Sequence, residues 1–208
     1  MPRKKLVRRP RPVFINAGCG SPENSRLPKF FRTWRQIRVD VDPAMQPDVV
    51  ANIADLSVIP DGSADAIWSA HCMEHLFAYQ VPAALAEFRR VLRKTGFACI
   101  IVPDLQAIAH WIAEDRLHET IYDSAAGPIT ARDMLWGFGA AIEGGNSAMA
   151  HHCGFTPTLF LECLKAAGFS EIVLRRKSNL ELVGLALPKI SKSSERRETL
   201  LTDLGLWV

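Results

Sequence analysis

Residues 13–20, VFINAGCG, decide the fold. An apolar run leads straight into a G-x-G turn, which predicts a buried strand followed by a loop whose backbone can approach a nucleotide-like ligand. A tight structural turn would explain the two glycines equally well. The dinucleotide-binding fingerprint also requires a third glycine, and Glu23 occupies that position. Because its carboxylate would repel a pyrophosphate, the segment argues against a nicotinamide dinucleotide.

Downstream of this segment, short apolar runs alternate with helical patterns. The first five runs are rich in Val and Ile and lack a polar alternation, which is typical of parallel strands buried on both faces. The gap between the last two runs is too short for a crossover helix, so these two should pair as an antiparallel hairpin. The pattern predicts an α/β fold with a Rossmann-like, doubly wound sheet. The expected strands are residues 13–15, 37–41, 49–53, 66–68, 97–102, 172–174 and 182–187.

The chain of 208 residues is expected to form one domain, residues 13–188, between two short extensions. Residues 1–12 form a basic arm, and residues 1–38 hold eleven Lys and Arg against one acid. Such an arm can attract nucleic acid through phosphate contacts, or remain a solvated terminus. Residues 189–208 form a C-terminal tail with a short amphipathic helix, which packs on its own domain or on a partner subunit. The apolar side chains of this helix are Leu200, Leu201, Leu204 and Trp207.

Two segments of the domain depart from the alternating pattern. Residues 21–36 contain Pro22 and Pro28, which predict a turn in place of the first helix. Residues 104–150 are rich in Ala and Gly and contain no expected strand. Because a segment of this length in a compact α/β domain is usually functional, we expect a lid or substrate-binding insertion there.

The composition excludes several classes of protein. No apolar run reaches the length of a membrane span, and no apolar stretch follows the basic start as it would in a secretory signal. The five cysteines are scattered and form no C-x-x-C pair, which indicates free thiols in a reducing cytoplasm. No metal site is expected. His71 and His75 stand four residues apart, but Cys72 occupies the place of the Glu in the zinc-binding pattern H-E-x-x-H.

Acidic residues follow the second and third expected strands. Asp40 lies 20 residues beyond Gly20, where a carboxylate can accept hydrogen bonds from both hydroxyls of a ribose, and Asp42 is the neighbouring alternative. Asp55 follows the third strand, where a carboxylate can accept from an adenine amino group while the N–H of Leu56 meets a ring nitrogen. A surface turn would also explain each of these acids.

Three further stretches carry a family resemblance. Residues 60–76 read PDGSADAIWSAHCMEHL, residues 87–96 read EFRRVLRKTG, and residues 154–169 begin GFTP and end AGF. Together with the segments above, they resemble class I S-adenosylmethionine-dependent methyltransferases over about residues 12–188. The small bacterial enzymes of the methyltransferase-11 type are the most similar. Each stretch alone is only moderately specific. The order and spacing of the stretches together make the resemblance strong.

The resemblance implies a seven-stranded sheet in the order 3-2-1-4-5-7-6, with strand 7 antiparallel. It also implies S-adenosyl-L-methionine as the cofactor and S-adenosyl-L-homocysteine as the product. Where the family often carries an acid, this chain has Asn16, whose amide cannot balance the ammonium group of the ligand. The residues that the resemblance places at the cofactor are Asn16, Ala17, Gly18, Cys19, Gly20, Asp40, Asp55, Leu56, Ser69, Ala70 and His71.

The function that the resemblance implies is methyl transfer to an unidentified acceptor, with a small molecule favoured. His71 follows the fourth expected strand and is the candidate catalytic base, or else it only orders its loop. Asp104, His151 and His152 are the next candidates. Two alternatives remain: a cofactor-binding module without catalysis, and a nicotinamide-dependent oxidoreductase, against which the missing third glycine argues. The oligomeric state is open.

Overall fold

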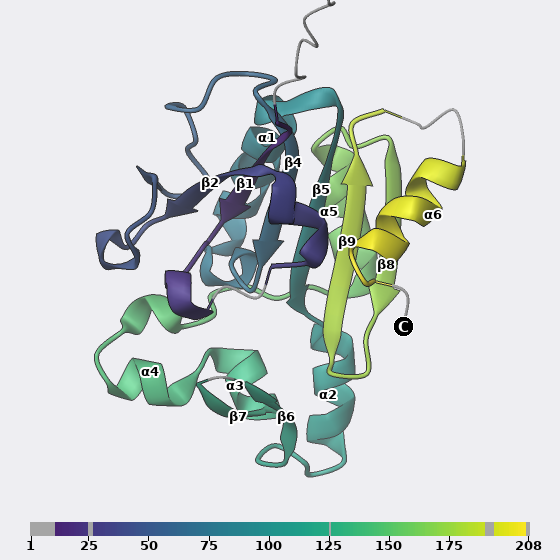
Figure 1. Ribbon diagram of the computed structural model, residues 1–208. Helices are drawn as coiled ribbons and strands as arrows, with labels where there is room; N and C mark the ends of the chain where they lie inside the picture. Colours follow the sequence, from purple (N-terminus) through teal and green to yellow (C-terminus); the bar gives the residue numbers. More distant parts are fainter. Residues whose placement is uncertain (1–10, 25–26, 125, 190–193, 207–208) are drawn as a thin grey trace, which may run out of the picture.

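The computed structural model in Figure 1 describes residues 11–24, 27–124, 126–189 and 194–206. Its centre is a seven-stranded sheet in the order β3-β2-β1-β4-β5-β9-β8. The first five strands are parallel, and β9 lies antiparallel between β5 and β8. The predicted strand order and closing hairpin are therefore confirmed. The strands are β1 (Val13–Ala17), β2 (Arg35–Asp40), β3 (Val49–Val50), β4 (Ala64–Ala70), β5 (Leu92–Pro103), β8 (Glu171–Arg176) and β9 (Glu181–Leu187).

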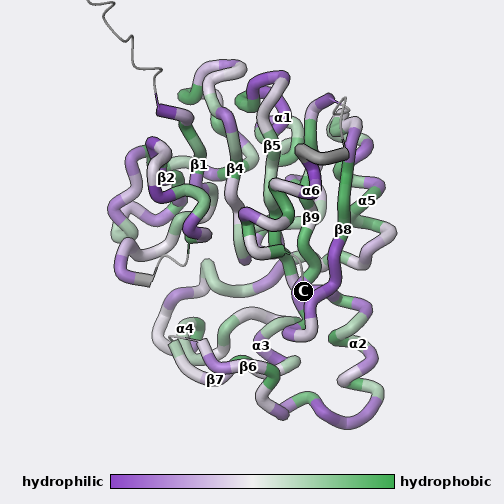
Figure 2. The backbone as a smooth tube through the Cα atoms, turned by 45° about the vertical axis from the view of Figure 1, so that its right-hand side comes forward, coloured by the Kyte–Doolittle hydropathy of each residue, from purple (hydrophilic) through white to green (hydrophobic). Residues whose placement is uncertain are grey.

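The strands form where apolar residues are buried on both faces of the sheet. Ile15 of β1 pairs with Ile37 of β2 and Ile67 of β4, so three adjacent strands carry β-branched residues in register. Hydrophobic residues run along β5 and β9 near the middle of the sheet (Figure 2). This is the pattern expected of a sheet covered on both sides.

Two helices cover one face of the sheet, α1 (Val81–Val91) and α5 (Pro157–Ala166). Thr156 caps α5 by accepting a hydrogen bond from the N–H of Leu159 at 3.3 Å. Phe88 of α1 and Phe160 of α5 are fully buried in the same core cluster. Three single-turn 3-10 helices lie in the connections on this part of the chain, η3 (Pro43–Met45), η4 (Met73–His75) and η5 (Ala78–Gln80).

Short turns cover part of the opposite face. As predicted, the described part of the segment after β1 holds only 3-10 turns, η1 (Pro22–Asn24) and η2 (Lys29–Thr33). Phe31 of η2 stacks on Phe14 of β1 with ring centroids 4.3 Å apart. An aromatic cluster therefore takes the place of the first crossover helix.

The C-terminal helix α6 (Ser194–Asp203) completes the cover of that face. Leu201 is 1% exposed and belongs to the same core cluster as Val183 and Leu185 of β9. The tail therefore packs on its own domain, which settles the choice that the sequence leaves open. Trp207, the last predicted apolar residue of the helix, lies outside the described residues.

The insertion after β5 contains a hairpin, so the expectation that it has no strand is wrong. β6 and β7 pair antiparallel as a separate two-stranded sheet. Alternation of Thr, Ile and Tyr, with a glycine at the turn, is a strand signal too short to stand out from the sequence around it. The elements of the insertion are α2 (Leu105–Ala113), β6 (Thr120–Ser124), β7 (Gly127–Thr130), α3 (Ala131–Trp136), α4 (Gly139–Glu143) and η6 (Ser147–Met149).

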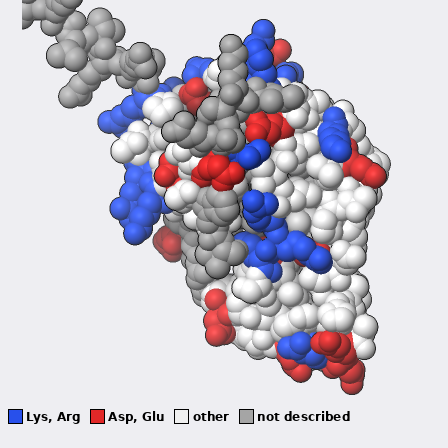
Figure 3. Space-filling view, turned by 90° about the vertical axis from the view of Figure 1, so that its right-hand side faces the viewer, with Lys and Arg blue, Asp and Glu red and all other residues white. Residues whose placement is uncertain are grey.

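The insertion lies beyond the carboxyl ends of the parallel strands, with α4 on the side of β1 and β2 (Figures 1 and 2). A small core of its own holds part of it, in which Ile108 and Ala131 are fully buried. At the far tip Arg116 lies between Glu114 and Glu119, at 3.2 and 2.7 Å, and charged side chains gather at this end of the molecule (Figure 3). The insertion is placed to cover the edge of the sheet where ligands of such folds bind.

Three further expectations concern the basic arm, membrane-spanning helices and the cysteines. Residues 1–10 of the basic arm lie outside the described residues, so binding of nucleic acid by the arm stays a prediction. Within the described residues, each helix is too short or too polar to cross a lipid bilayer. The five cysteines all lie in described segments and are free thiols, as predicted.

Replacing Leu201 with alanine should destabilise the domain by about 2–5 kcal/mol, because it removes a buried side chain and leaves a cavity between α6 and β9. The measurement is the free energy of unfolding in urea. Leu159→Ala is the matched control, since Leu159 is 44% exposed on α5. This control should change stability by no more than about 0.5 kcal/mol. Equal effects of the two substitutions would show that α6 does not pack on the sheet in solution.

Candidate functional site

The carboxyl ends of β1, β2 and β4 meet at one edge of the sheet. Asn16 of β1 pairs with Arg38 of β2 and with Trp68 of β4, so the residues that follow the three strands begin side by side. The edge therefore brings together three of the predicted groups: residues 16–20, Asp40 and residues 69–71. Open α/β sheets bind their ligands at this edge.

The loop after β1 depends on both of its glycines. Gly18 and Gly20 have φ angles of +72° and +57°, in the left-handed region that favours glycine. A Cβ on Gly18 would collide with the Sγ of Cys72, whereas one on Gly20 would face open space. The N–H groups of Gly18 and Cys19 donate to the carbonyl of Val39 at 2.9 and 3.0 Å. Packing within the chain explains Gly18, and the open side of Gly20 is available to a ligand.

Asp40 joins this loop to the end of β2. Its Oδ2 accepts from the N–H of Gly20 at 2.9 Å, and its Oδ1 accepts from the N–H of Asp42 at 3.0 Å. Because a carboxylate oxygen can accept more than one hydrogen bond, both oxygens can still receive a ligand hydroxyl. Asp42 instead caps η3 by accepting from the N–H of Ala44 at 2.8 Å. The two acids therefore have different partners, and only Asp40 touches the glycine loop.

Arg38 is a part of this edge that the sequence analysis missed. Its guanidinium donates to the carbonyl of Gly20 at 2.6 Å, and to the carbonyls of Gln46 and Met45 at 2.7 and 2.8 Å. The planar fork of the side chain thus fastens the glycine loop to the turn after β2. An arginine within a strand gives no sequence signal for such a role.

The two predicted adenine contacts after β3 have partners inside the protein. The N–H of Leu56 donates to Oε2 of Glu87 at 2.7 Å, so it is not free to meet a ring nitrogen. Asp55 is exposed and accepts from the N–H of Ser57 at 3.1 Å, and hydrogen bonds from Ser57 hold the pKa of Asp55 below its ordinary value. Asn52 and Ile53 lie nearer to the end of β3, whose Val50 pairs with Asp40.

The remaining predicted residues line the inner part of the edge. Asn16 and Ser69 are buried polar side chains beside the fully buried Ala17, and Ala70 ends β4. Within the described residues the hydroxyl of Ser69 has no hydrogen-bond partner. A buried hydroxyl without a partner is costly, which favours a ligand atom at this point.

Two thiols also lie at this edge. Burial raises the pKa of Cys19 and of Cys72. Both side chains therefore remain protonated at neutral pH, and a protonated thiol is a poor nucleophile. A reactive methyl donor at this edge would not be attacked by them.

His71 is held between two carboxylates. Its Nε2 lies 2.9 Å from Oε1 of Glu181, and its Nδ1 lies 3.3 Å from Oε1 of Glu74. Burial alone would lower the pKa of His71, but the hydrogen bond to Glu181 and the negative charges of Glu181 and Glu74 outweigh burial and raise it to about 10. The ring therefore keeps both of its protons at neutral pH. A protonated imidazole cannot accept a proton, so the geometry argues against His71 as a catalytic base.

Glu74 and Glu181 are the partners that the sequence analysis did not assign to the site. Burial alone would raise the pKa of each carboxyl, but the positive charge of His71 outweighs burial and lowers both pKa values, so that both groups stay ionised. Glu181 begins β9, 110 residues after His71, and only the sheet order brings the two together. His71 thus ties the loop after β4 to β9.

A cavity of about 240 Å³ lies between the insertion and the end of β5, the strand that pairs with β4. Its lining includes Pro103 at the end of β5, Met134 and Trp136 of α3, and the predicted contacts His151 and His152. Burial lowers the pKa of His151, so its ring is neutral at neutral pH. Asp104 does not line this cavity; its buried carboxylate binds the Nε of Arg176 at 2.5 Å.

Comparison with known proteins agrees with this arrangement. The family model described as "Methyltransferase domain" matches residues 15–100, which run from β1 to the middle of β5 and include the glycine loop, Asp40 and His71. No curated protein matches the chain.

Solved structures share the fold at low sequence identity. The PH0226 protein of Pyrococcus horikoshii is 15% identical with a TM-score of 0.58, over 88% of this chain and 84% of that one. A SAM-dependent methyltransferase of Archaeoglobus fulgidus is 13% identical with a TM-score of 0.53, over 85% and 86%. A Thermotoga maritima protein described as a possible histamine N-methyltransferase is 12% identical with a TM-score of 0.56, over 87% and 84%.

At these identities the solved structures establish the fold alone, and the family model matches less than half of the chain. The cofactor of this family is S-adenosyl-L-methionine. Residues 15–100 match the model of the methyltransferase domain family, and the chain shares its fold with solved structures described as SAM-dependent methyltransferases.

Proposed function

We propose that this protein transfers the methyl group of S-adenosyl-L-methionine to a small-molecule acceptor and releases S-adenosyl-L-homocysteine. The observation that carries the proposal is the hydrogen bond from the N–H of Gly20 to the carboxylate of Asp40 at 2.9 Å. It fixes a left-handed glycine loop beside an acid that keeps free acceptor sites, at the edge where this fold binds ligands.

The residues at the edge fit the cofactor in their chemistry. Asp40 would accept from the two ribose hydroxyls, and the open side of Gly20 leaves room for the nucleoside to approach. Asn16 and the unpartnered hydroxyl of Ser69 offer polar contacts to the methionine moiety. For the adenine, residues 52–53 replace Leu56 as the candidates, because the N–H of Leu56 is already bound to Glu87.

The bound cofactor supplies a methyl group on a positively charged sulfur, which an acceptor atom displaces in line as the carbon–sulfur bond breaks. The protein has then to align the acceptor and exclude water, and positioning of this kind is worth about 7–11 kcal/mol. Cys19 and Cys72 stay protonated and do not compete for the methyl group. His71 acts as a positioning residue that holds the loop after β4 against Glu181.

The cavity of about 240 Å³ beside the edge is the place proposed for the acceptor. It lies between the insertion and the end of β5, and its lining combines apolar side chains with two histidines. Its volume lies somewhat below the range of about 300–1,000 Å³ that is usual for small-molecule sites, which favours a compact acceptor.

Transfer of labelled methyl from S-adenosyl-L-methionine into fractionated cell extract tests this function. A labelled product that depends on the protein supports it and identifies the acceptor. Cofactor binding without any labelled product would favour the binding module without catalysis.

Thermal stability measured with S-adenosyl-L-homocysteine and with NAD separates the methyltransferase from the oxidoreductase. A ligand at 100 times its Kd stabilises the folded chain by about 2.7 kcal/mol. Stabilisation by NAD instead of S-adenosyl-L-homocysteine would favour the oxidoreductase.

Asp40→Ala should weaken binding of S-adenosyl-L-homocysteine by at least about tenfold, because each lost hydrogen bond to a charged group contributes about 1.5–3 kcal/mol. Titration calorimetry gives the Kd. Asp42→Ala is the matched control, since Asp42 caps η3 and does not contact the glycine loop. The control should bind nearly as the unaltered chain does. A larger loss in Asp42→Ala than in Asp40→Ala would contradict the assignment of the ribose acid.

Hydrogen exchange should separate the insertion into two parts. Residues 139–149 hold α4 and η6, which bury no side chain, and their amides should exchange fast and slow down when S-adenosyl-L-homocysteine binds. The amides around the fully buried Ile108 of α2 should be slow throughout. If residues 139–149 are as protected as α2 without ligand, this part of the insertion is a fixed cap and not a lid.

His71→Asn should lower thermal stability and cofactor affinity together, because it leaves Glu74 and Glu181 without the cation between them. Melting temperature, Kd and turnover are measured on the same preparation. If turnover instead falls by about 10²- to 10⁴-fold while stability and cofactor binding are intact, His71 is the catalytic base and the positioning role is wrong.

A further inference from the structure

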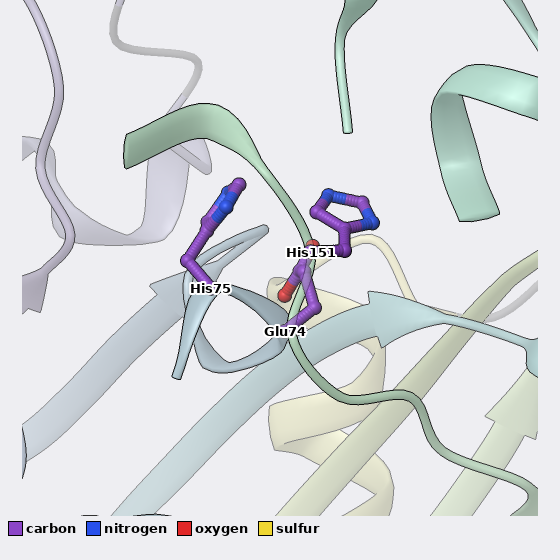
Figure 4. Close-up of side chains that lie close together, drawn as sticks. All are labelled: Glu74, His75 and His151. Atoms are coloured by element: carbon purple, nitrogen blue, oxygen red, sulfur yellow. The ribbon is translucent and has the colours of Figure 1, made fainter. Parts of the chain in front are cut away.

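Three side chains that can bind a metal converge next to the proposed active site. Glu74 and His75 lie on η4, directly after β4, and His151 lies in the segment that follows η6. Each residue offers one ligand atom, and these atoms lie within 4.8 Å of one another. Figure 4 shows the two imidazole rings above the carboxylate, and the ring centroids are 4.8 Å apart.

Backbone carbonyls set the proton positions of both imidazoles. Nδ1 of His75 lies 3.1 Å from the carbonyl of Ala150, and Nδ1 of His151 lies 2.9 Å from the carbonyl of Met134. A carbonyl oxygen only accepts, so each Nδ1 carries the hydrogen and donates it. The Nε2 of each neutral ring then keeps its lone pair. Histidines that bind metals are usually oriented by such a hydrogen bond from the other ring nitrogen.

The carboxylate of Glu74 is a second, independent feature of the cluster, because its ion pair with His71 leaves most of its acceptor capacity unused. Glu74 is fully buried, and within the described residues neither of its oxygens has an aligned hydrogen bond. Its nearest charged partner is Nδ1 of His71, 3.3 Å from Oε1, a contact close enough for an ion pair but not aligned as a hydrogen bond. A buried carboxylate usually has several hydrogen bonds or a metal ion, because removing it from water is otherwise costly.

We propose that Glu74, His75 and His151 bind one divalent transition-metal ion of the Zn²⁺ type. Two imidazoles and one carboxylate are the donor set that such ions prefer over Mg²⁺ or Ca²⁺. Three protein ligands leave at least one coordination position open. His151 also lines the cavity of about 240 Å³, so an ion held by it would border the space proposed for the acceptor.

The sequence hides this site. His75 and His151 are 76 positions apart, and the helical H-E-x-x-H pattern is absent. The insertion returns from α4 to the end of β5, and this path places His151 beside η4. There the N–H of His152 donates to the carbonyl of Glu74 at 2.9 Å. From the sequence we expect no metal site, because Cys72 interrupts the zinc-binding pattern between His71 and His75. This proposal departs from that expectation.

The test begins by treating the full, untagged chain with a chelator, which is then removed. The chain is titrated with Zn²⁺ in a calorimeter, which gives the number of ions bound and their affinity. We expect one ion per chain, and a loss of affinity of at least about tenfold in His151→Asn and in His75→Asn. Asparagine keeps an N–H donor near the position of Nδ1 and removes Nε2, so the two variants should keep their fold. His110→Asn is the matched control, because His110 is exposed on α2 and lies 3.2 Å from Glu114, outside the cluster.

Co²⁺ gives a second readout, because its visible absorption reports coordination by protein ligands. New absorption bands are expected in the unaltered chain and in His110→Asn, and not in His151→Asn. No saturable Zn²⁺ binding, or equal affinity in the unaltered chain and both cluster variants, would overturn the proposal. Since the titration contains no cofactor, such a result would leave the proposed methyl transfer untouched.

Discussion

The hydrogen bond between the Gly20 N–H and the Asp40 carboxylate is the contact on which the proposed site depends. It holds a loop in the left-handed conformation against the end of the neighbouring strand, and Arg38 of the same strand binds the carbonyl of Gly20 in that loop. The parallel sheet makes this contact possible, because it brings the ends of β1 and β2 to one edge in register. The acid is thereby positioned before any ligand arrives, which lowers the entropic cost of binding.

A second set of contacts organises the other half of that edge. His71 links Glu74 on the loop after β4 to Glu181 on the antiparallel strand β9. The antiparallel hairpin therefore does more than close the sheet, because its first residue anchors the loop next to the proposed acceptor cavity. The insertion approaches from the opposite side and contributes His151 to the same neighbourhood. The glycine loop and the insertion thus both lie against the segment after β4, at Cys72 and at Glu74 respectively.

Much of the fold could be predicted from the sequence, because local patterns determine it. Short apolar runs identified every strand of the main sheet, and the short gap before β9 identified the hairpin. The pair β6–β7 was missed because its alternation is only a few residues long. The packing of α6 on Val183 and Leu185 depends on tertiary contacts that no local pattern reports.

The site was less predictable than the fold for the same reason. The glycine loop and Asp40 follow strands directly and could be found from spacing. Glu181 and His151 reach the site from distant segments, and the N–H of Leu56 is taken by Glu87, which the sequence does not reveal. The most direct test of the central claim is a crystal structure of the chain with S-adenosyl-L-homocysteine. The account predicts both ribose hydroxyls within hydrogen-bond distance of the Asp40 carboxylate and the adenine beside residues 52–53. A ribose on Asp42, or a ligand away from the glycine loop, would contradict it.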